Sequence, residues 1–197
     1  MTEEEFDTWL DEQPDIRAEW ADGKVYVMSN ATFYHNILAM WLGALLTLFV
    51  EERNLGVVAS DNQMRLRQQR RRRLPDVYFV RKERMKLMNM SKGVMDGPFD
   101  LAIEIVSDSD PVHDYVTKFR EYESAGVAEY WIADPQNRHL SGWRLADGVY
   151  VALDRDDVGR MHSRVLPGLW VRQADLFADP RPTVASALAQ LEAKSEQ

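Results

Sequence analysis

Two acidic side chains stand at or inside the most apolar stretches of the sequence. Asp76 directly precedes the apolar run Val77–Val80, and Glu104 lies within the run Leu101–Val106. An isolated carboxylate in such surroundings is costly unless a cation compensates its charge. Lys118 supplies an ammonium group one helix later in the chain. These residues predict a site where two carboxylates and a lysine meet around a divalent metal ion.

The spacing of β-strands makes this convergence possible. Neighbouring strands lie about 4.8 Å apart, so acids at facing positions can reach one small cation. Mg²⁺ takes oxygen ligands and keeps several waters, so Asp76, Glu104 and one backbone carbonyl, that of Ile105, suffice as protein ligands. A bound cation activates water and polarises a phosphoryl oxygen. The expected chemistry is phosphodiester hydrolysis, with Lys118 supplying positive charge to the attacking water or the phosphorane oxygens.

Each of these residues also has a purely structural interpretation. Pro75-Asp76 is a common turn dipeptide. Glu104 could pair with any buried lysine or arginine, and Lys118 forms an ordinary i, i+4 ion pair with Asp114 if both lie on a solvated helix. Their combination and order, rather than any single residue, favour a reactive site.

A dense run of arginines precedes Asp76. Six arginines fall between positions 65 and 73, and the last four are consecutive: Arg70, Arg71, Arg72 and Arg73. This run is either a solvated hairpin loop or a patch that contacts and steers nucleic-acid phosphates, and the sequence leaves both interpretations open. The net charge of −8 argues against indiscriminate wrapping by nucleic acid, because phosphate attraction scales with local cationic density.

Length and composition predict one globular domain over residues 1–197, with a core at about 16–170 and a C-terminal helix in 172–197. The absence of cysteine excludes disulfides, thiolate zinc sites and cysteine nucleophiles. The acidic start lacks the pattern of a secretory signal, so we expect a cytoplasmic protein. The most apolar stretch, Ile37–Val50, is shorter than the roughly 18 residues that span a bilayer, so we expect no membrane partner.

Periodicity and turn residues predict an alternation of helices and strands. The sequence therefore predicts an α/β (α+β) fold with a central mixed β-sheet flanked by helices, after an N-terminal hairpin and a long helix. Residues Ser29 or Asn30 would cap the long helix, and Asp110-Pro111 would open the helix that carries Lys118. The expected helices cover 2 to about 14, 30–53, 110–126 and 184–193; the expected strands cover 16–20, 24–28, 56–60, 63–67, 75–80, 99–106, 129–133, 140–145, 149–153 and an edge at 161–170, with an irregular polar segment at 81–97.

Other catalytic classes have no local support. The sequence contains no Gly-x-Ser-x-Gly, Gly-x-x-x-x-Gly-Lys or Gly-x-Gly-x-x-Gly motif, which excludes the common serine hydrolase, P-loop and dinucleotide patterns. The four histidines are scattered without metal-ligand spacing: His35, His113, His139 and His162.

Several short segments occur in a specific order along the chain. They are Glu19–Gly23, Met28-Ser29 and His35, then Pro75-Asp76, Ile103–Ser107, Asp114-x-x-x-Lys118-x-x-x-Tyr122 and Gly126–Pro135. Together they resemble the Uma-two family of restriction-endonuclease-like proteins, within the PD-(D/E)XK nuclease superfamily. The similarity spans about Glu19 to Pro135.

This resemblance implies a restriction-endonuclease-like core and a Mg²⁺ or Mn²⁺ site that cuts DNA. Asp76 and Glu104 match the two acids of the motif, and Glu19 would be an additional acidic ligand from the N-terminal part. Val106 occupies the usual lysine position, so the lysine role passes to Lys118. His35 and Glu129 are interpreted first as structural residues. Family analogy also predicts a homodimer. The alternative is a catalytically silent nucleic-acid-binding or assembly module that keeps the nuclease fold.

Overall fold

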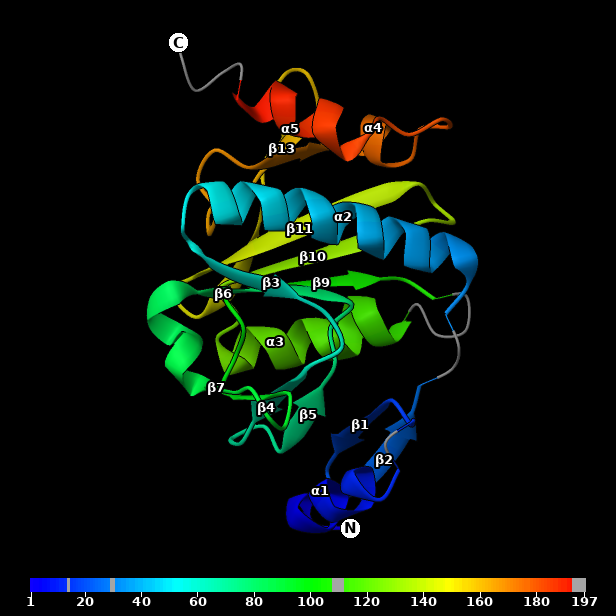
Figure 1. Ribbon diagram of the computed structural model, residues 1–197, viewed down its shortest axis with the longest axis vertical. Helices are drawn as coiled ribbons and strands as arrows, with labels where there is room; N and C mark the ends of the chain where they lie inside the picture. Colours follow the sequence, from blue (N-terminus) through cyan, green and yellow to red (C-terminus); the bar gives the residue numbers. More distant parts are fainter. Residues whose placement is uncertain (14, 29–30, 108–111, 193–197) are drawn as a thin grey trace.

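The computed structural model describes residues 1–197 except 14, 29–30, 108–111 and 193–197. Its centre is a six-stranded mixed sheet with the strand order β12-β11-β10-β9-β6-β3 (Figure 1). Only β9 and β10 run parallel in this sheet; the other neighbours are antiparallel. The strands are β3 (Gly56–Ala59), β6 (Val77–Arg81), β9 (Leu101–Ile105), β10 (Glu129–Asp134), β11 (His139–Ala146) and β12 (Val149–Ala152).

Helices cover both faces of this central sheet. Helix α2 (Phe33–Glu52) lies on one face, and a π-helix η2 (His113–Lys118) that continues into α3 (Phe119–Ala125) lies on the other (Figure 1). Gly126, in the left-handed conformation with φ 85°, ends α3. Every residue of β9 and β10 is buried, as expected for strands covered on both sides.

Alternation along the strands separates two apolar cores. Phe79 and Ile103 face α2 and join its buried leucines, while Tyr78 and Ala102 face α3 and its neighbours. Because side chains alternate across a strand, Glu104 follows Ala102 onto the α3 face. The carboxylate is thereby directed toward the helix that carries Lys118.

A second six-stranded sheet, in the order β2-β1-β5-β4-β8-β7, lies beyond α3 together with the N-terminal helix (Figure 1). Thr2 and Glu5 form the predicted capping box at the start of that helix. The arginine run itself supplies strand β5, which was not predicted. The elements are α1 (Glu3–Asp11), β1 (Ala18–Ala21), β2 (Lys24–Val27), β4 (Gln63–Leu66), β5 (Arg71–Arg73), η1 (Lys82–Leu87), β7 (Met88–Asn89) and β8 (Val94–Asp96).

The C-terminal part differs from the expected single edge strand and single helix. Residues 161–170 do not extend the central sheet; β13 (Arg160–His162) pairs with β14 (Trp170–Arg172) in a separate two-stranded sheet. Two helices follow instead of one, α4 (Gln173–Leu176) and α5 (Val184–Glu192). Figure 1 shows α5 beside α2, on the side away from the central sheet.

The long helix begins slightly later than predicted. Thr32 is its N-cap, and the Thr32 hydroxyl accepts a hydrogen bond from the backbone N–H of His35. The predicted caps Ser29 and Asn30, and the predicted Asp110-Pro111 helix start, lie outside the described residues. By length and composition alone α2 could cross a membrane. Six of its residues are instead buried in the protein core, among them Leu38, Leu42 and Phe49.

Candidate active site

The first two strands of the site bring Asp76 and Glu104 together. In the antiparallel pair of β6 and β9, Val77 faces Ile103, so the preceding residue Asp76 comes opposite Glu104. The backbone N–H of Ile105 donates to Asp76 Oδ2 at 2.8 Å. Both carboxylates line one cavity of about 760 Å³. The structure therefore brings these two acids to facing positions on neighbouring strands, where both line the same cavity.

Lys118 enters the site from η2 and is 3% exposed. Its Nζ lies 2.8 Å from Glu104 Oε2, 3.2 Å from Asp114 Oδ1 and 3.7 Å from Glu19 Oε1. Burial alone would lower the pKa of Lys118, but the surrounding carboxylates raise it well above its ordinary value. The lysine therefore stays protonated and acts as a fixed positive charge.

Glu104 has the opposite tendency. Tyr122 donates its hydroxyl to Glu104 Oε1 at 2.6 Å. Burial raises the pKa of Glu104 to about 8; Lys118 opposes this shift, while the like charges of Asp76, Asp114 and Glu19 add to it. Burial, more than the neighbouring acids, therefore favours the protonated form of Glu104, while the Lys118 ammonium favours the ionised form.

Glu19 reaches the cluster from β1. Arg73 Nη1 donates to Glu19 Oε2 at 2.8 Å, and the Leu74 N–H donates to Oε1 at 3.0 Å. Burial alone would raise the pKa of Glu19, but Lys118, a hydrogen bond from His113, Arg73 and the Leu74 N–H hold it well below its usual range. Glu19 is therefore ionised, and each of its oxygens already accepts a hydrogen bond.

His35 contacts the site from the first turn of α2. Its Nε2 lies 3.2 Å from Asp76 Oδ2. Burial alone would lower the pKa of His35, but the hydrogen bond and charge of Asp76 outweigh burial and raise it. The first interpretation of His35 as a packing residue is thus incomplete, because its ring orients one of the two acids.

The arginine run does not form the expected phosphate-steering patch. The Arg72 and Arg73 side chains are each 1% exposed and are directed inward from β5. Arg73 makes a bidentate contact with Glu121, at 2.7 and 2.8 Å, in addition to its bond to Glu19. Arg72 donates to Asp7 at 2.6 Å. A guanidinium group enclosed in this way cannot meet a phosphate, so the prediction is wrong for these two residues.

The other two members of the run are less enclosed. Arg71 pairs with Glu121 at 2.6 Å and with Asp22 at 2.7 Å. Arg70 is exposed, with its backbone in the left-handed region at φ 53°. Of the four arginines, Arg70 is the one whose placement leaves the phosphate-contact prediction open.

The cavity around the acids is lined by several structural elements. Strand β2 and the residues after it form one wall, the start of α2 forms another, and the ends of β6 and β9 with η2 form the floor. Tyr26 and Tyr34 contribute aromatic rings to the lining, and Arg17 and His35 contribute basic side chains.

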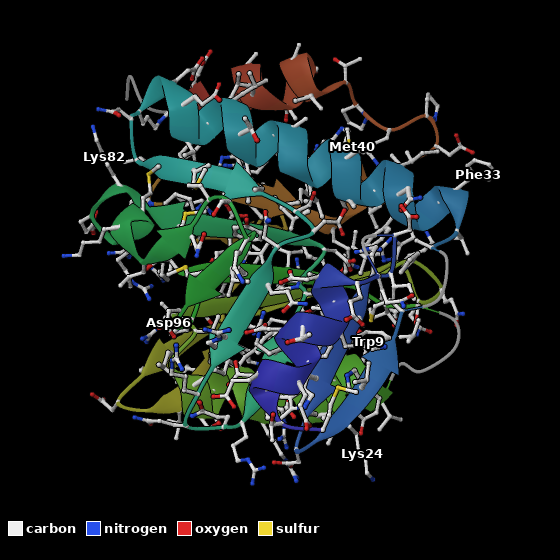
Figure 2. The ribbon with its side chains drawn as sticks, turned by 60° about the horizontal axis from the view of Figure 1, so that its bottom comes forward. Trp9, Lys24, Phe33, Met40, Lys82 and Asp96 are labelled. Carbon is white, nitrogen blue, oxygen red and sulfur yellow. The ribbon has the colours of Figure 1, made fainter. Side chains whose placement is uncertain are left out.

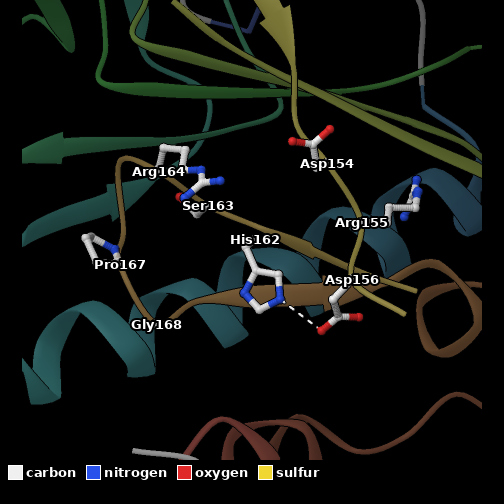
Figure 3. Close-up of a pocket in the computed structure, with 8 residues that line it drawn as sticks. All are labelled: Asp154, Arg155, Asp156, His162, Ser163, Arg164, Pro167 and Gly168. Atoms are coloured by element: carbon white, nitrogen blue, oxygen red, sulfur yellow. Dashed lines mark hydrogen bonds and ion pairs between the residues drawn. The ribbon is translucent and has the colours of Figure 1, made fainter. Parts of the chain in front are cut away.

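A second hollow, of about 500 Å³, is lined by residues 154–156 after β12, by the end of β13 and by the loop that follows it (Figure 3). In it His162 Nε2 lies 3.1 Å from Asp156 Oδ2. Asp156 also accepts the backbone N–H groups of Val158 and Arg160, and Arg155 donates to the Leu140 carbonyl. These contacts hold a turn together, and none of them involves a residue of the acidic cluster.

Comparison with known proteins identifies the family of the chain. The sequence model of a family described as "Putative restriction endonuclease" matches residues 3–176, most of the chain. The chain belongs to the Uma-two family. The predicted family and the mixed α/β fold class are thereby confirmed.

One solved structure shares the fold of this Uma-two protein. It is the crystal structure of a "putative nuclease" belonging to the DUF820 family from Anabaena variabilis, with a TM-score of 0.68 and 15% sequence identity. The match covers 85% of this chain and 96% of that chain. No curated protein matches the sequence. The family and the fold together support a nuclease.

Several contacts of the Uma-two site were not foreseen. Glu19 alone gave a hint of such a contact, because a buried acid on a strand needs a cation beside it, and that cation is Arg73. No local sequence pattern links Glu19 to Arg73, because the two lie far apart in the chain. Glu129 is structural, as first interpreted: it accepts hydrogen bonds from Trp131 Nε1 and from the backbone of Arg164 and Val165.

Proposed function

We propose that this protein is a Mg²⁺- or Mn²⁺-dependent nuclease that hydrolyses DNA phosphodiester bonds at the cluster of Asp76, Glu104 and Lys118. The observation that carries the proposal is the buried Lys118 ammonium, 2.8 Å from Glu104, on the floor of a cavity that Asp76 also lines. The desolvation cost of burying a lysine among four acids must be strongly compensated. An apolar residue would fill the same space without this cost, so packing alone does not explain the lysine.

The residues fit a hard divalent cation. Four carboxylates (Glu19, Asp76, Glu104, Asp114) surround one lysine, and burial together with the other three like charges raises the pKa of Glu104. The described residues contain no group of three or more His, Asp or Glu side chains that could by itself hold a metal. Mg²⁺ nevertheless typically binds to proteins through one or two carboxylates and keeps several waters as its other ligands, so Asp76, Glu104 and the Ile105 carbonyl would suffice.

Each residue then has a separate task. Asp76 and Glu104 would hold the ion, which when bound supplies an activated water and polarises the phosphoryl oxygen. Lys118, which stays protonated, stabilises negative charge that develops on the phosphorane oxygens. Glu19, whose Oε1 lies 3.7 Å from Lys118 Nζ, is proposed to position Lys118 and to serve as the additional acidic ligand. Tyr122 fixes the orientation of Glu104.

A plasmid assay tests the proposal. Purified protein is incubated with supercoiled plasmid and Mg²⁺ or Mn²⁺, with a chelator as the blank. Nicking should fall by about 10²- to 10³-fold in Glu104→Gln and in Lys118→Met, because each removes a group that stabilises charge in the transition state. Asp96→Asn, a surface ion-pair residue far from the cavity, is the matched control. Circular dichroism verifies that each variant is folded. DNA binding without metal-dependent cutting by the wild type would favour the silent module instead.

The proposed assembly is a homodimer through the outer face of α2. Phe33, Ile37 and Met40 are 90%, 57% and 72% exposed and follow one another at helical spacing; Figure 2 shows Phe33 and Met40 on α2. Residues 33–50 contain no Lys, Arg, Asp or Glu, so two copies of a chain with net charge −8 can approach there without repulsion. Light scattering after gel filtration should give twice the chain mass, and Met40→Glu should give monomers. A monomeric wild type would refute the dimer.

A further inference from the structure

The cavity beside the acids has features that specify its substrate more closely. We infer that it takes an unpaired nucleotide, stacked on Tyr26 and Tyr34, so that the substrate is a single strand or a frayed end rather than an intact duplex. This inference rests on the proposed nuclease function for its biological meaning. The size of the cavity, the placement of the two tyrosines and the distribution of positive charge support it.

The cavity has the size and shape of a site for one small ligand. Its volume of about 760 Å³ falls in the range of about 300 to 1,000 Å³ found for sites that enclose a small molecule. Walls from the β2 hairpin and from the start of α2 stand over the floor that carries the acids. An intact duplex offers its phosphates on a convex surface with its bases stacked inside. A phosphate reaches an enclosed floor more easily when its nucleotide is free to leave the stack.

Two exposed tyrosines line this cavity next to the acids. Tyr26 is 45% exposed, and on the antiparallel β1–β2 pair it lies directly opposite Glu19. Facing residues of such a pair point to the same side of the sheet, with Cβ atoms about 4.5 to 5.5 Å apart. Tyr34 is 44% exposed, on the opposite wall, and its ring centroid is 5.8 Å from the Arg181 guanidinium carbon. Exposed aromatic rings are stacking platforms for unpaired bases.

Among the described residues that line the cavity, few are lysines or arginines, and those few are paired with acids. A protein that grips a duplex neutralises many phosphates with free lysines and arginines. Here Arg72 and Arg73 are enclosed, and Arg17, which lines the cavity, pairs with Asp61. Lys118 is the further cationic residue on the floor. Binding energy must therefore come mainly from base stacking, and stacking faces are available only on unpaired bases.

A binding assay without cleavage tests the inference. Fluorescence anisotropy is measured with a labelled oligothymidylate and with a labelled blunt hairpin duplex of equal phosphate number, with Ca²⁺ in place of Mg²⁺. We expect the single strand to bind at least about tenfold more tightly. Tyr26→Ala and Tyr34→Ala should each weaken single-strand binding about tenfold, while Tyr26→Phe and Tyr34→Phe retain it, because a phenyl ring still stacks. Met90→Ala, at a residue that is 78% exposed and outside the cavity lining, should bind as the wild type does.

The outcomes separate this inference from the nuclease proposal. Metal-dependent cutting with equal binding of hairpin and single strand, unaffected by Tyr26→Ala and Tyr34→Ala, would overturn the inference and leave the nuclease intact. Tyrosine-dependent single-strand binding without any cutting would support the inference and refute the nuclease. Equal loss of binding in the phenylalanine and alanine variants would also overturn it, since hydroxyl contacts rather than stacking would then be responsible.

Discussion

At the scale of single residues, the ionisation of Glu104 sets the behaviour of the site. Its pKa, raised to about 8 by burial and by neighbouring acids, means that the metal-free protein holds a proton which the unfolded chain releases near 4.5. The sequence foretold this residue because a lone glutamate in an apolar strand demands compensation. The same need for compensating charge pointed to Lys118. The sequence indicated only a structural role for His35, because a histidine near a helix start has many such roles.

This raised pKa predicts how stability depends on pH. Between about pH 4.5 and pH 8 the folded metal-free protein binds more protons than the unfolded chain, so its free energy of unfolding should fall as pH rises, by at most about 1.4 kcal/mol per pH unit. His35, whose pKa is also raised, adds to this loss above its ordinary value of 6.5. Urea titrations at several pH values measure the slope, and Glu104→Gln should flatten it.

The same proton links pH to the metal. A cation at Asp76 and Glu104 would displace the Glu104 proton, so Mn²⁺ should bind more tightly at pH 8 than at pH 6 and raise the melting temperature more. Calorimetric titration in two buffers of different ionisation enthalpy measures the released proton. Mn²⁺ affinity that is independent of pH in the wild type would contradict this assignment.

The arginine run shows where residue-level prediction fails. From the sequence, the four consecutive arginines are solvated or bind phosphates. The sequence does not reveal the partners of Arg73, because they lie far away in the chain, on β1 and α3. Arg73→Ala should destabilise the protein by about 3 to 5 kcal/mol, since it leaves the buried Glu19 unpaired and removes the bidentate bond to Glu121. Arg70→Ala, three positions away and exposed, is the matched control and should change stability by less than about 0.5 kcal/mol. Chemical denaturation measures both, and equal effects would refute the structural role.

At the scale of elements, the sequence predicted the strands and helices that carry strong periodicity. The apolar run that contains Glu104 predicted strand β9. The sequence also predicted the helix that carries Lys118 and its end at Gly126. The π-helical turn of η2, which carries both Asp114 and Lys118 of the cluster, had no recognisable signal in the sequence. Such turns recur at functional sites because they reposition side chains locally.

The junction of β3 with β6 supplies an element-scale prediction. Gly56 has φ 155°, and a Cβ there would collide with the Val80 carbonyl oxygen and lie 3.0 Å from Arg81 Cα. Gly56→Ala should therefore cost about 3 kcal/mol or more, because backbone of the central sheet must move. Gly43→Ala, inside α2, meets only Val77 Cγ2 at 3.9 Å and should be neutral or stabilising by up to about 1 kcal/mol. Thermal unfolding compares them; a harmless Gly56→Ala would show that β3 is not held this tightly.

At the scale of the whole molecule, the sequence predicted one mixed sheet, whereas the described residues form two six-stranded sheets and a two-stranded one. Local patterns identify strands but not distant partners: β1 pairs with β5, and β4 pairs with β8, across long stretches of chain. The second sheet matters for function, because β1 and β5 bring Glu19 and Arg73 to the acids on the central sheet. The site is therefore held by elements from both sheets, and its outer ligands could not be read from spacing alone.

The overall charge distribution leads to the last prediction. The net charge is −8, Arg73 is paired internally, and the described lining of the cavity offers phosphates few lysines or arginines, Arg17 and Lys118. If two or three phosphates are neutralised, the logarithm of the single-strand association constant should fall with the logarithm of salt concentration at a slope of about −2 or shallower. Anisotropy titrations from low to high potassium chloride measure this slope. A slope of about −5 or steeper would mean that about seven or more phosphates are neutralised, and the stacking account of the cavity would then be wrong.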